Sequence, residues 1–572
     1  MNQEVLMSVD ILIVGAGPTG LLLAAQLARY GIKPRLVDKN PEPSKTSKAI
    51  AVFARTLEIF DHLGIAEEAM KRGRKLNQFN FYADRKRIVN LPLDRLDSFL
   101  PLVLCLPQSQ TEDILGRLVE NLGVKIERSV TFTGLKQDAD GVTATLCHPD
   151  GREEHCRASW LIGCDGARST IRQEAGLVDE GANIPGLFIL ADAETNWSLS
   201  PNEVHIFLNS DGVFAVFPLP EENYWRVIAD LPPDRSLPED PDLKVFEQLA
   251  HERSRLETQL TNPLWTSTFR IRQRMVGKCR AGRVFVAGDA LSSHSPVGGQ
   301  GMNTGLQDAY NLAWKLALVI QNQARAELLD SYQAEREPIS KSLLAATGLA
   351  TRAITVRNPI FTQARDRIAK FATSFESVQQ RIRNTVSELN VNYRNSPIVQ
   401  ENHPLPIHLH PNEPSLRDWW DFRTQPKAGD RAPDVMIETV DGAKRLFQVL
   451  SDLKHNLLLF GGKVAQKVNC AKLSQIAQEV EEKFRDRIDV HIVLLNSLIP
   501  EELEWFKSIL LDPQGKCHHR YSATGECLYL IRPDGYIGYR TQPADVSKLW
   551  AYLQKINLFE SVDEMHSVSL SR

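Results

Sequence analysis

A glycine-rich turn near the N-terminus constrains the fold of this 572-residue chain more than any other feature. Gly15, Gly17 and Gly20 form a G-x-G-x-x-G pattern. A short run of apolar, mostly β-branched residues at 10–14 precedes it, and an apolar stretch with helical periodicity follows at 21–30. This order predicts a β-α-β unit, and therefore a parallel sheet.

Each glycine of the turn has a physical task. Gly15 permits the tight turn, Gly17 lets the backbone approach a pyrophosphate, and Gly20 allows the helix to pack closely on the strand. A second predicted strand at 33–37 ends at Asp38, whose carboxylate can accept hydrogen bonds from a ribose and would repel a 2′-phosphate. The pattern predicts a bound dinucleotide other than NADP; a glycine turn without a ligand is the alternative.

Two later segments favour FAD over NAD. Asp165-Gly166 follows a predicted buried strand, and Gly288-Asp289 follows another and continues into a glycine-rich stretch at 296–303. An aspartate after a buried strand can accept a hydrogen bond from a ribityl hydroxyl. A helix N-terminus can stabilise the negative charge that develops on a flavin ring during reduction.

These segments together resemble the class A flavoprotein monooxygenases, the aromatic hydroxylases that include para-hydroxybenzoate hydroxylase and phenol hydroxylase. The residues that carry the resemblance are 13–20, Asp165-Gly166 with Ser169 and Arg172, Gly288-Asp289, 55–58 and 329–336. The resemblance implies that NAD(P)H reduces FAD and that a hydroperoxide formed with dioxygen at flavin C4a hydroxylates an aromatic substrate. It leaves the choice between NADPH and NADH open.

The resemblance also implies which residues hold the cofactor. Asp38 would bind the adenosine ribose, Arg55 and Gln108 would lie near the flavin and pyrophosphate, and Asp289 would bind the ribityl chain. Surface polarity is the alternative for Arg55 and Gln108. The full predicted cofactor set is Gly15, Gly17, Pro18, Thr19, Gly20, Asp38, Lys39, Lys48, Arg55, Gln108, Asp165, Gly166, Gly288, Asp289, Pro296, Gly299, Gly301, Met302 and Asn303.

No catalytic base is identified, because Ile50 stands where phenol hydroxylase has an acidic residue. His294 is a substrate-side candidate, with a surface or structural role as the alternative. Phe207, Phe214, Phe217 and Trp225 are further substrate candidates, and an ordinary hydrophobic core is the alternative for each. The apolar character of this region favours a bulky, weakly charged aromatic substrate, such as a polyketide or a substituted phenol.

The C-terminal part resembles the thioredoxin-like domain of the phenol hydroxylase and polyketide hydroxylase branches, through residues 429–434 and 532–536. Redox activity in that fold needs a C-x-x-C pair, and the stretch 461–470 directly after the first apolar strand contains only Cys470. A structural or oligomerisation role is therefore expected.

The predicted fold is α/β: a Rossmann-like FAD domain, an inserted mixed or antiparallel β-sheet domain, and a thioredoxin-like α/β domain. The expected boundaries are 1–182 and 276–395 for the FAD domain, 183–275 for the substrate domain, 396–426 for a linker and 427–560 for the last domain.

Composition excludes several other classes. With 67 basic and 71 acidic residues the net charge is −4, which gives no electrostatic case for nucleic acid or an anionic membrane. The eight cysteines lack the spacing of a metal site or a disulfide framework. We expect a cytoplasmic enzyme without a metal, and leave a homodimer open. A Baeyer–Villiger or antibiotic-modifying monooxygenase and a non-catalytic flavin-binding redox sensor are the alternatives.

Overall fold

The computed structural model divides the chain into two compact units. One unit comprises Met1–Tyr310 and Arg336–Leu389, and the other comprises Asn311–Glu335 and Asn390–Arg572. The residues that the structure describes are 7–46, 49–83, 86–93, 96–100, 103–183, 186–231, 241–270, 272–293, 298–354, 375–403, 416–424, 426–462, 470–495, 499–503, 505–556, and positions 362, 369, 371, 373 and 558.

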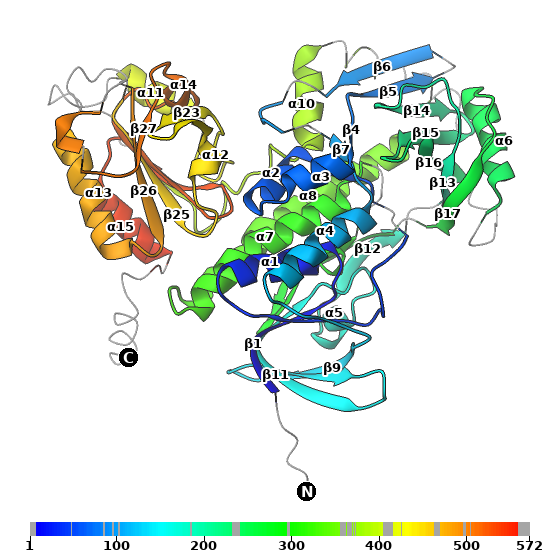
Figure 1. Cartoon of the computed structure of the whole chain (residues 1–572), viewed down its shortest axis with the longest axis horizontal. Coiled ribbons are helices and arrows are strands. Elements are labelled where there is room, and N and C mark those ends of the chain that lie inside the picture. Colours follow the sequence, from blue (N-terminus) through cyan, green and yellow to red (C-terminus); the bar gives the residue numbers. More distant parts are fainter. Residues whose placement is uncertain are drawn as a thin grey trace, which may run out of the picture. The chain divides into compact units, whose positions relative to one another are not determined.

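The first unit is built on the predicted parallel sheet, which confirms the β-α-β unit at the N-terminus (Figure 1). The core of β1 is buried from Ile11 to Val14, and α1 begins with Pro18 at its first position, where the missing N–H costs nothing. The sheet runs in the order β19 (Arg280–Ala281), β20 (Val284–Val286), β11 (Glu153–Gly163), β1 (Met7–Val14), β2 (Arg35–Asp38) and β8 (Ile126–Arg128), with β10 (Val142–Cys147) on β11 and β9 (Thr131–Gln137) on β10.

The parallel strands of this sheet end at one edge. Strands β20, β11, β1, β2 and β8 pair in parallel, so Val14, Asp38, Gly163 and Val286 lie at their carboxyl ends. In sheets of this kind ligands bind beside the carboxyl ends of the strands. The glycine turn, Asp165-Gly166 and Gly288-Asp289 therefore reach the same edge from three different places in the sequence.

A second sheet in the first unit is the predicted insertion, and it is larger than the sequence indicated. Residues from Gln78 to Pro92 contribute β5 and β6, and β14 pairs with β5 in parallel. Its order is β17 (Thr261–Phe269), β13 (Leu187–Glu194), β16 (Tyr224–Leu231), β15 (Gly212–Pro218), β14 (Glu203–Asn209), β5 (Gln78–Ala83) and β6 (Lys86–Pro92).

Helices and two small sheets complete the first unit. The helices are α1 (Pro18–Arg29), α2 (Ala54–His62), α3 (Ala66–Arg72), α4 (Gln108–Asn121), α5 (Thr170–Glu174), α6 (Leu243–Ser254) and α10 (Glu376–Val386), with η1 (Gly288–Ala290) and parts of α7 (Gly301–Ile320) and α8 (Asp330–Ile354). The small sheets are β12 (Asp179–Asn183), β18 (Arg272–Val276) and β21 (Ser292–Ser293), and β3 (Ala51–Phe53), β7 (Val103–Cys105) and β4 (Arg74–Lys75).

The second unit contains a mixed sheet whose middle strands β25 and β26 are parallel and are linked by α13. Its strands run in the order β22 (Gln400–Asn402), β29 (Ile537–Thr541), β28 (Cys527–Ile531), β25 (His455–Phe460), β26 (Ile488–Leu494), β27 (Ile509–Leu511), β23 (Met436–Thr439) and β24 (Gly442–Arg445). Its helical segments are η2 (Ala326–Leu329), α11 (Leu416–Thr424), α12 (Leu446–Val449), α13 (Cys470–Phe484), η3 (Glu501–Leu503), α14 (Lys516–Arg520) and α15 (Val546–Lys555). The α/β character is as expected; the thioredoxin-like assignment stays a prediction.

The segment expected to be a linker at 396–426 belongs to this sheet in part. Strand β22 pairs with β29 in parallel, and α11 follows it along the chain. A strand of three polar residues has too little periodicity to be recognised in a sequence.

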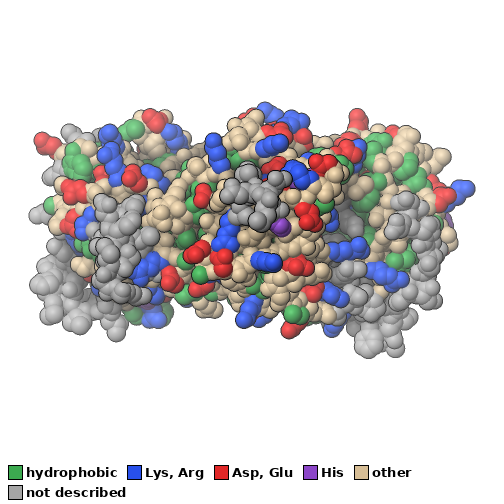
Figure 2. Space-filling model, turned by 90° about the horizontal axis from the view of Figure 1, so that it is seen from below, with side chains coloured by type: hydrophobic (Ala, Val, Ile, Leu, Met, Phe, Trp, Pro, Cys, Tyr) green, Lys and Arg blue, Asp and Glu red, His purple; other side chains and the backbone are tan. Residues whose placement is uncertain are grey.

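The surface charges agree with the near balance of basic and acidic residues in the sequence. On the face drawn in Figure 2, basic and acidic side chains are interspersed rather than segregated by sign. Among the described residues, none of the helices combines the length and the apolar character that a membrane span requires.

Candidate flavin site

The first loop of the site is packed so tightly that two of its glycines cannot carry a side chain. A Cβ at Gly15, where φ is +107°, would lie 2.3 Å from the carbonyl oxygen of Cys164, and one at Gly20 would lie 1.9 Å from that of Gly15. At Gly17, by contrast, a Cβ would meet no atom within 4 Å. The strand and helix are therefore in close contact, while open space remains beside Gly17 for a ligand to approach the backbone.

Asp38 holds this loop from the end of β2. Its two carboxylate oxygens accept hydrogen bonds from the backbone N–H of Ala16 at 2.6 Å and of Asn40 at 2.8 Å. The side chain is buried, and Arg128 lies 3.8 Å away. Each carboxylate oxygen has a further lone pair, so Asp38 can fix the loop and still accept a hydrogen bond from a ribose.

The predicted Asp165 caps a helix. It accepts hydrogen bonds from Ser169 Oγ at 2.5 Å and from the N–H groups of Thr170 and Ile171 at 2.7 and 3.2 Å. Arg172, on the short helix that follows, donates to the carbonyl oxygen of Ala290 at 3.1 Å. Asp165 thus orders α5, and Arg172 links this segment to Gly288-Asp289.

The segment after β20 packs against the first loop through glycine. Gly288 has φ +63°, and a Cβ on it would lie 2.6 Å from Thr19 Oγ1, as would one on Gly305 in α7. Asp308 Oδ2 accepts from the N–H of Gly288 at 3.0 Å, and Asp308 Oδ1 accepts from Arg336 at 2.6 Å. The side chain of Asp289 is exposed to solvent.

The N-terminus of α7 is tied to β3 by Asn303. Its side-chain oxygen accepts from the N–H of Phe53 at 3.0 Å, and its Nδ2 donates to the carbonyl oxygens of Ala51 at 2.8 Å and Gly299 at 3.1 Å. Gly299 has φ +67°. Gly301 and Met302 are the first two residues of α7, and both are half-buried. The amide groups of this first turn present the positive end of the helix dipole.

Two predicted polar residues have protein partners. Arg55 is buried and pairs with Glu58 at 2.9 Å, and Gln108 donates to Glu112 at 2.8 Å. Burial raises the pKa of Glu112. Lys39 is exposed, whereas Lys48, His294 and Pro296 lie outside the described residues.

The four aromatic substrate candidates are divided between the two faces of the second sheet. Phe207, Phe214 and Trp225 lie in a core cluster with residues of α6, where Tyr82 stacks on Phe207 at 4.8 Å between ring centroids. Phe217 belongs instead to a cluster that contains Ile50 and Phe53. Packing in the core therefore accounts for the first three, and only Phe217 lies on the face toward β3.

The contacts of the residues behind α7 were not predicted from the sequence. Asp308 and Arg336 pair across two helices, and Glu388, with φ +60°, accepts hydrogen bonds from Thr304 and Gln307. Arg336 lies in the segment 329–336 that carries the family resemblance, but its pairing with Asp308, and the role of Glu388, join residues at least 28 positions apart and leave no local pattern.

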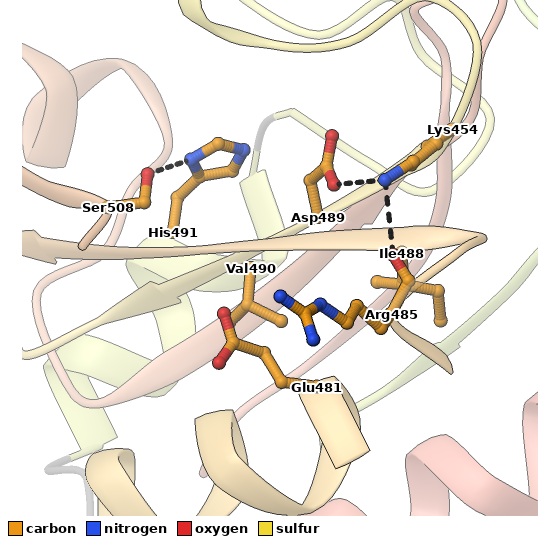
Figure 3. A pocket seen from close by; sticks show the side chains of 8 residues that line it. All are labelled: Lys454, Glu481, Arg485, Ile488, Asp489, Val490, His491 and Ser508. Carbon is orange, nitrogen blue, oxygen red and sulfur yellow. Dashed lines mark hydrogen bonds and ion pairs between the residues drawn. The ribbon is translucent and has the colours of Figure 1, made fainter. Parts of the chain in front are cut away.

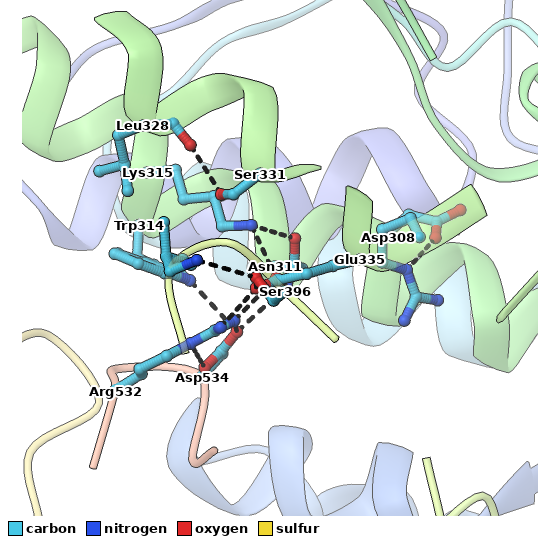
Figure 4. A network of polar contacts seen from close by, with 12 residues as sticks. Asp308, Asn311, Trp314, Lys315, Leu328, Ser331, Glu335, Ser396, Arg532 and Asp534 are labelled. Carbon is cyan, nitrogen blue, oxygen red and sulfur yellow. Dashed lines mark hydrogen bonds and ion pairs between the residues drawn. The ribbon is translucent and has the colours of Figure 1, made fainter. Parts of the chain in front are cut away.

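The second unit holds a buried polar network and a small cavity. Glu335 contacts Lys315 at 2.8 Å and Arg532 at 2.6 Å, and Arg532 also pairs with Asp534 (Figure 4). A cavity of about 250 Å³ lies beside β26, where His491 contacts Ser508 at 2.6 Å (Figure 3). The cavity is lined by Lys454, Glu481, Arg485, Ile488, Asp489, Val490, His491 and Ser508.

Two cysteine side chains that the structure describes in the second unit are poor candidates for redox chemistry. Cys517 and Cys527 are buried and free, and burial raises the pKa of both thiols well above the usual value. A thiol that stays protonated is a poor nucleophile.

Comparison with known proteins identifies the family. A family model described as an FAD binding domain matches residues 8–347. The chain is 33% identical over 559 residues to 6-methylpretetramide 4-monooxygenase of Streptomyces rimosus, covering 96% of this chain and 94% of the relative. It is 30% identical over 547 residues to pentachlorophenol 4-monooxygenase of Sphingobium chlorophenolicum, covering 95% and 91%.

A solved structure agrees with both relatives. The anhydrotetracycline hydroxylase OxyS of Streptomyces rimosus superposes with a TM-score of 0.72 at 27% identity, covering 97% of this chain and 100% of that one. The chain belongs to the family of FAD-dependent aromatic monooxygenases. It is an enzyme that uses FAD, NAD(P)H and dioxygen, and the open backbone at Gly17 with the acceptor at Asp38 fits the nucleotide.

Proposed function

We propose that the enzyme hydroxylates a bulky, weakly charged aromatic compound of the fused-ring polyketide kind, bound between the second sheet and the N-terminus of α7. The single observation that carries the proposal is the apolar sheet face around Phe217. Half-buried Phe217, Ile206 and Tyr224 pack there against Ile50 and Phe53. Such a surface favours a large ring system over a small polar substrate.

The charges on this sheet face support the same substrate class. Arg226 pairs with Asp192 through two contacts of 2.7 Å, and Trp265 Nε1 donates to Asp192 at 2.8 Å. Arg74, on β4 of a small neighbouring sheet, donates to the carbonyl oxygens of Leu219 and Pro220 directly after β15. Because both guanidinium groups have protein partners, neither offers the bidentate clamp that would select a substrate carboxylate.

The same proposal places the cofactor. Gly15, Gly17, Pro18, Thr19 and Gly20 cradle the pyrophosphate of FAD. Asp38 binds its ribose, and the Gly288-Asp289 segment lies along the ribityl chain. FAD supplies the redox chemistry. The first turn of α7, with Gly299, Gly301, Met302 and Asn303, faces the flavin ring, where its amides stabilise negative charge.

The test is a substrate panel with the flavin-loaded protein. Fused-ring phenols, simple phenols and aromatic carboxylates are compared by NAD(P)H consumption, hydrogen peroxide release and mass of product. We expect fused-ring phenols to give one added oxygen atom per NAD(P)H with little peroxide. Coupled turnover confined to small aromatic carboxylates would overturn the proposal, and products with an oxygen inserted into the ring would indicate Baeyer–Villiger oxidation.

A variant tests the position of the substrate. Ile206→Trp fills the sheet face beside Phe217 and should lower turnover of the fused-ring substrate at least tenfold while a simple phenol is still accepted. Val178→Phe, at an exposed position of the same unit, is the control and should leave turnover unchanged. Equal effects of both variants would contradict the placement.

A cytoplasmic location and a homodimer complete the proposal. The described cysteines are free, as in a reducing compartment. On α11, Leu416 and Trp420 are exposed four residues apart and so share a helix face, which supports association of two chains. Light scattering after gel filtration should give the mass of a dimer; Trp420→Ser should shift it to a monomer.

A further inference from the structure

Glu388 combines three features that are costly together. Its side chain is buried, its backbone has φ +60°, a conformation that favours glycine, and it carries an ionisable group. Strained backbone of this kind persists where the surrounding structure maintains it, and it concentrates at functional sites.

The carboxyl group of Glu388 is bonded to α7. Oε1 accepts a hydrogen bond from Thr304 Oγ1 at 3.4 Å, and Oε2 accepts one from Gln307 Nε2. Thr304 and Gln307 lie one turn apart, directly after Asn303. Glu388 therefore contacts the first two turns of α7.

The backbone beside Glu388 contacts two more elements of the site. The carbonyl oxygen of Ser387 accepts from the N–H of Arg55 at the start of α2, at 3.3 Å. The carbonyl oxygen of Thr385 accepts from Gln300 Nε2 at 3.0 Å. Residues 385–388, at the end of α10 and directly after it, thus contact α2, the glycine-rich segment and α7.

Burial favours the neutral form of Glu388, whereas the charge of Arg336 and the hydrogen bonds from Gln307 and Thr304 favour the ionised form. From α7, Asp308 brings a second carboxylate; from α8, Arg336 already pairs with Asp308. On α2, Arg55 pairs with Glu58, and on α10, Arg383 pairs with Glu376. Burial raises the pKa of Glu388 to about 8. Gln307 Oε1 is buried and has no hydrogen-bond partner among the described residues. When the side-chain amide of Gln307 is rotated by 180°, the hydroxyl group of a protonated Glu388 donates a hydrogen bond to this oxygen.

We propose that Glu388 is a positioning residue for the flavin: its neutral carboxyl group locks the N-terminal turns of α7 against the ring. The inference rests on the flavin placement proposed above. Ionised Glu388 repels Asp308 and weakens the positive end of the α7 dipole that would face the flavin. FAD therefore binds well only to the protein in which Glu388 is protonated.

Two substitutions distinguish the effect of the Glu388 carboxyl group from the effect of the strained backbone. Glu388→Gln keeps a neutral polar side chain of the same size. Glu388→Gly removes the side chain and relieves the left-handed strain, and its thermal unfolding shows whether a loss of FAD affinity comes from misfolding. Thermal unfolding of each variant should stay near that of the wild type.

The measurement is the dissociation constant of FAD for the apoprotein between pH 6.5 and pH 9. For the wild type we expect about tenfold weaker binding at pH 9 than at pH 7, because only the protonated fraction is competent. Glu388→Gln should bind with no such pH dependence, and Glu388→Gly should bind weakly at every pH. Glu337→Gln, at a half-buried acid of α8 that pairs with Lys341, is the control and should follow the wild type.

The apoprotein gives a second readout. Because the pKa of Glu388 is raised in the folded state, its contribution to the free energy of unfolding is full below about pH 4.5 and is lost as the pH rises toward 8. The difference in unfolding free energy between wild type and Glu388→Gln should change with pH in this window.

Two results would overturn the inference. One is a Glu388→Gln profile parallel to that of the wild type; the other is wild-type FAD affinity in Glu388→Gly. Asn303→Ala separates this failure from failure of the flavin placement. If Asn303→Ala weakens FAD binding and the Glu388 variants do not, the inference alone is wrong. If Asn303→Ala has no effect, the placement is wrong and the inference fails with it.

Discussion

The side chain of Asp38 holds the first loop in place and is also the proposed acceptor for the ribose of FAD. It accepts two backbone N–H groups, from Ala16 and Asn40, within 2.8 Å. Hydrogen bonds to a charged acceptor contribute about 1.5–3 kcal/mol each, so Asp38→Ala should weaken FAD binding by roughly 10- to 100-fold. Titration of the apoprotein by flavin fluorescence measures this. Glu42→Ala, an exposed acid four residues away, should have no effect; equal losses in both variants would contradict the assignment.

At the residue scale, the role of a residue could be predicted from the sequence only where its partners lie close to it along the chain. The glycine turn and Asp38 are recognised because their spacing is set by one β-α-β unit. The contacts of Asp308, Arg336 and Glu388 are not, since their partners are 28 and 84 residues apart, although Arg336 lies in a segment that carries the family resemblance. Periodicity places Asp308 in a helix but cannot tell which buried partner it meets.

Within the second sheet, alternation along strands decides which aromatic residues are structural. Phe214 is fully buried in the cluster with α6, whereas Phe217, three residues later, is half-buried on the other face. Phe214→Ala should lower the free energy of unfolding by about 3–5 kcal/mol through the cavity it leaves. Phe217→Ala should change KM for the aromatic substrate with a much smaller loss of stability. Denaturant unfolding and steady-state kinetics compare the two; the reverse pattern would place the substrate on the α6 face.

The helix segments of the second unit depend on a buried charged network. Glu335 is fully buried between Lys315 and Arg532, which lower the pKa of its carboxyl group. Breaking a buried pair by removing one charge costs about 3–5 kcal/mol, so Glu335→Gln should be strongly destabilising. Glu337→Gln, which disrupts an exposed pair with Lys341, should cost less than about 1 kcal/mol. Similar values from chemical denaturation would refute a buried role.

The same network has a pH signature. The folded-state pKa of Glu335 lies below its unfolded value, so the stabilisation is complete above about pH 4.5 and is lost as the pH falls below it. Wild-type stability should therefore decline more steeply with acid than that of Glu335→Gln. Unfolding free energies measured from pH 6 to pH 3 give the two slopes.

At the element scale, the sequence was informative wherever neighbours in the fold are neighbours in the chain. The strand pairs β15–β16 and β28–β29 are antiparallel and are bounded by turn residues, and their region was expected to be β. The parallel pair β5–β14 joins segments about 125 residues apart and has no turn signal. Its strands at 78–92 were therefore missing from the predicted substrate domain.

At the scale of the whole molecule, the two compact units do not correspond to two consecutive stretches of the chain. Asn311–Glu335 belongs with the C-terminal unit, although it lies between two stretches of the first. Trp314 and Lys315 are buried there with Glu335, and the partners Ser396, Arg532 and Asp534 all come from beyond residue 389. Helix α7 therefore ends, and helix α8 begins, in the unit that also contains the C-terminal part of the chain.

This arrangement predicts that the C-terminal part is needed for cofactor binding, although it holds none of the predicted flavin residues. A chain ending at Leu389 leaves Glu335 without Arg532 and uncovers Trp314 on the helix whose first turn carries Asn303. We expect such a chain to lose cooperative thermal unfolding and stoichiometric FAD. Co-expression of residues 390–572 should restore both, because the missing partners then return. A truncated chain that binds one FAD and unfolds at the wild-type temperature would mean that α7 is held by the first unit alone, and that the buried network stabilises only the C-terminal part.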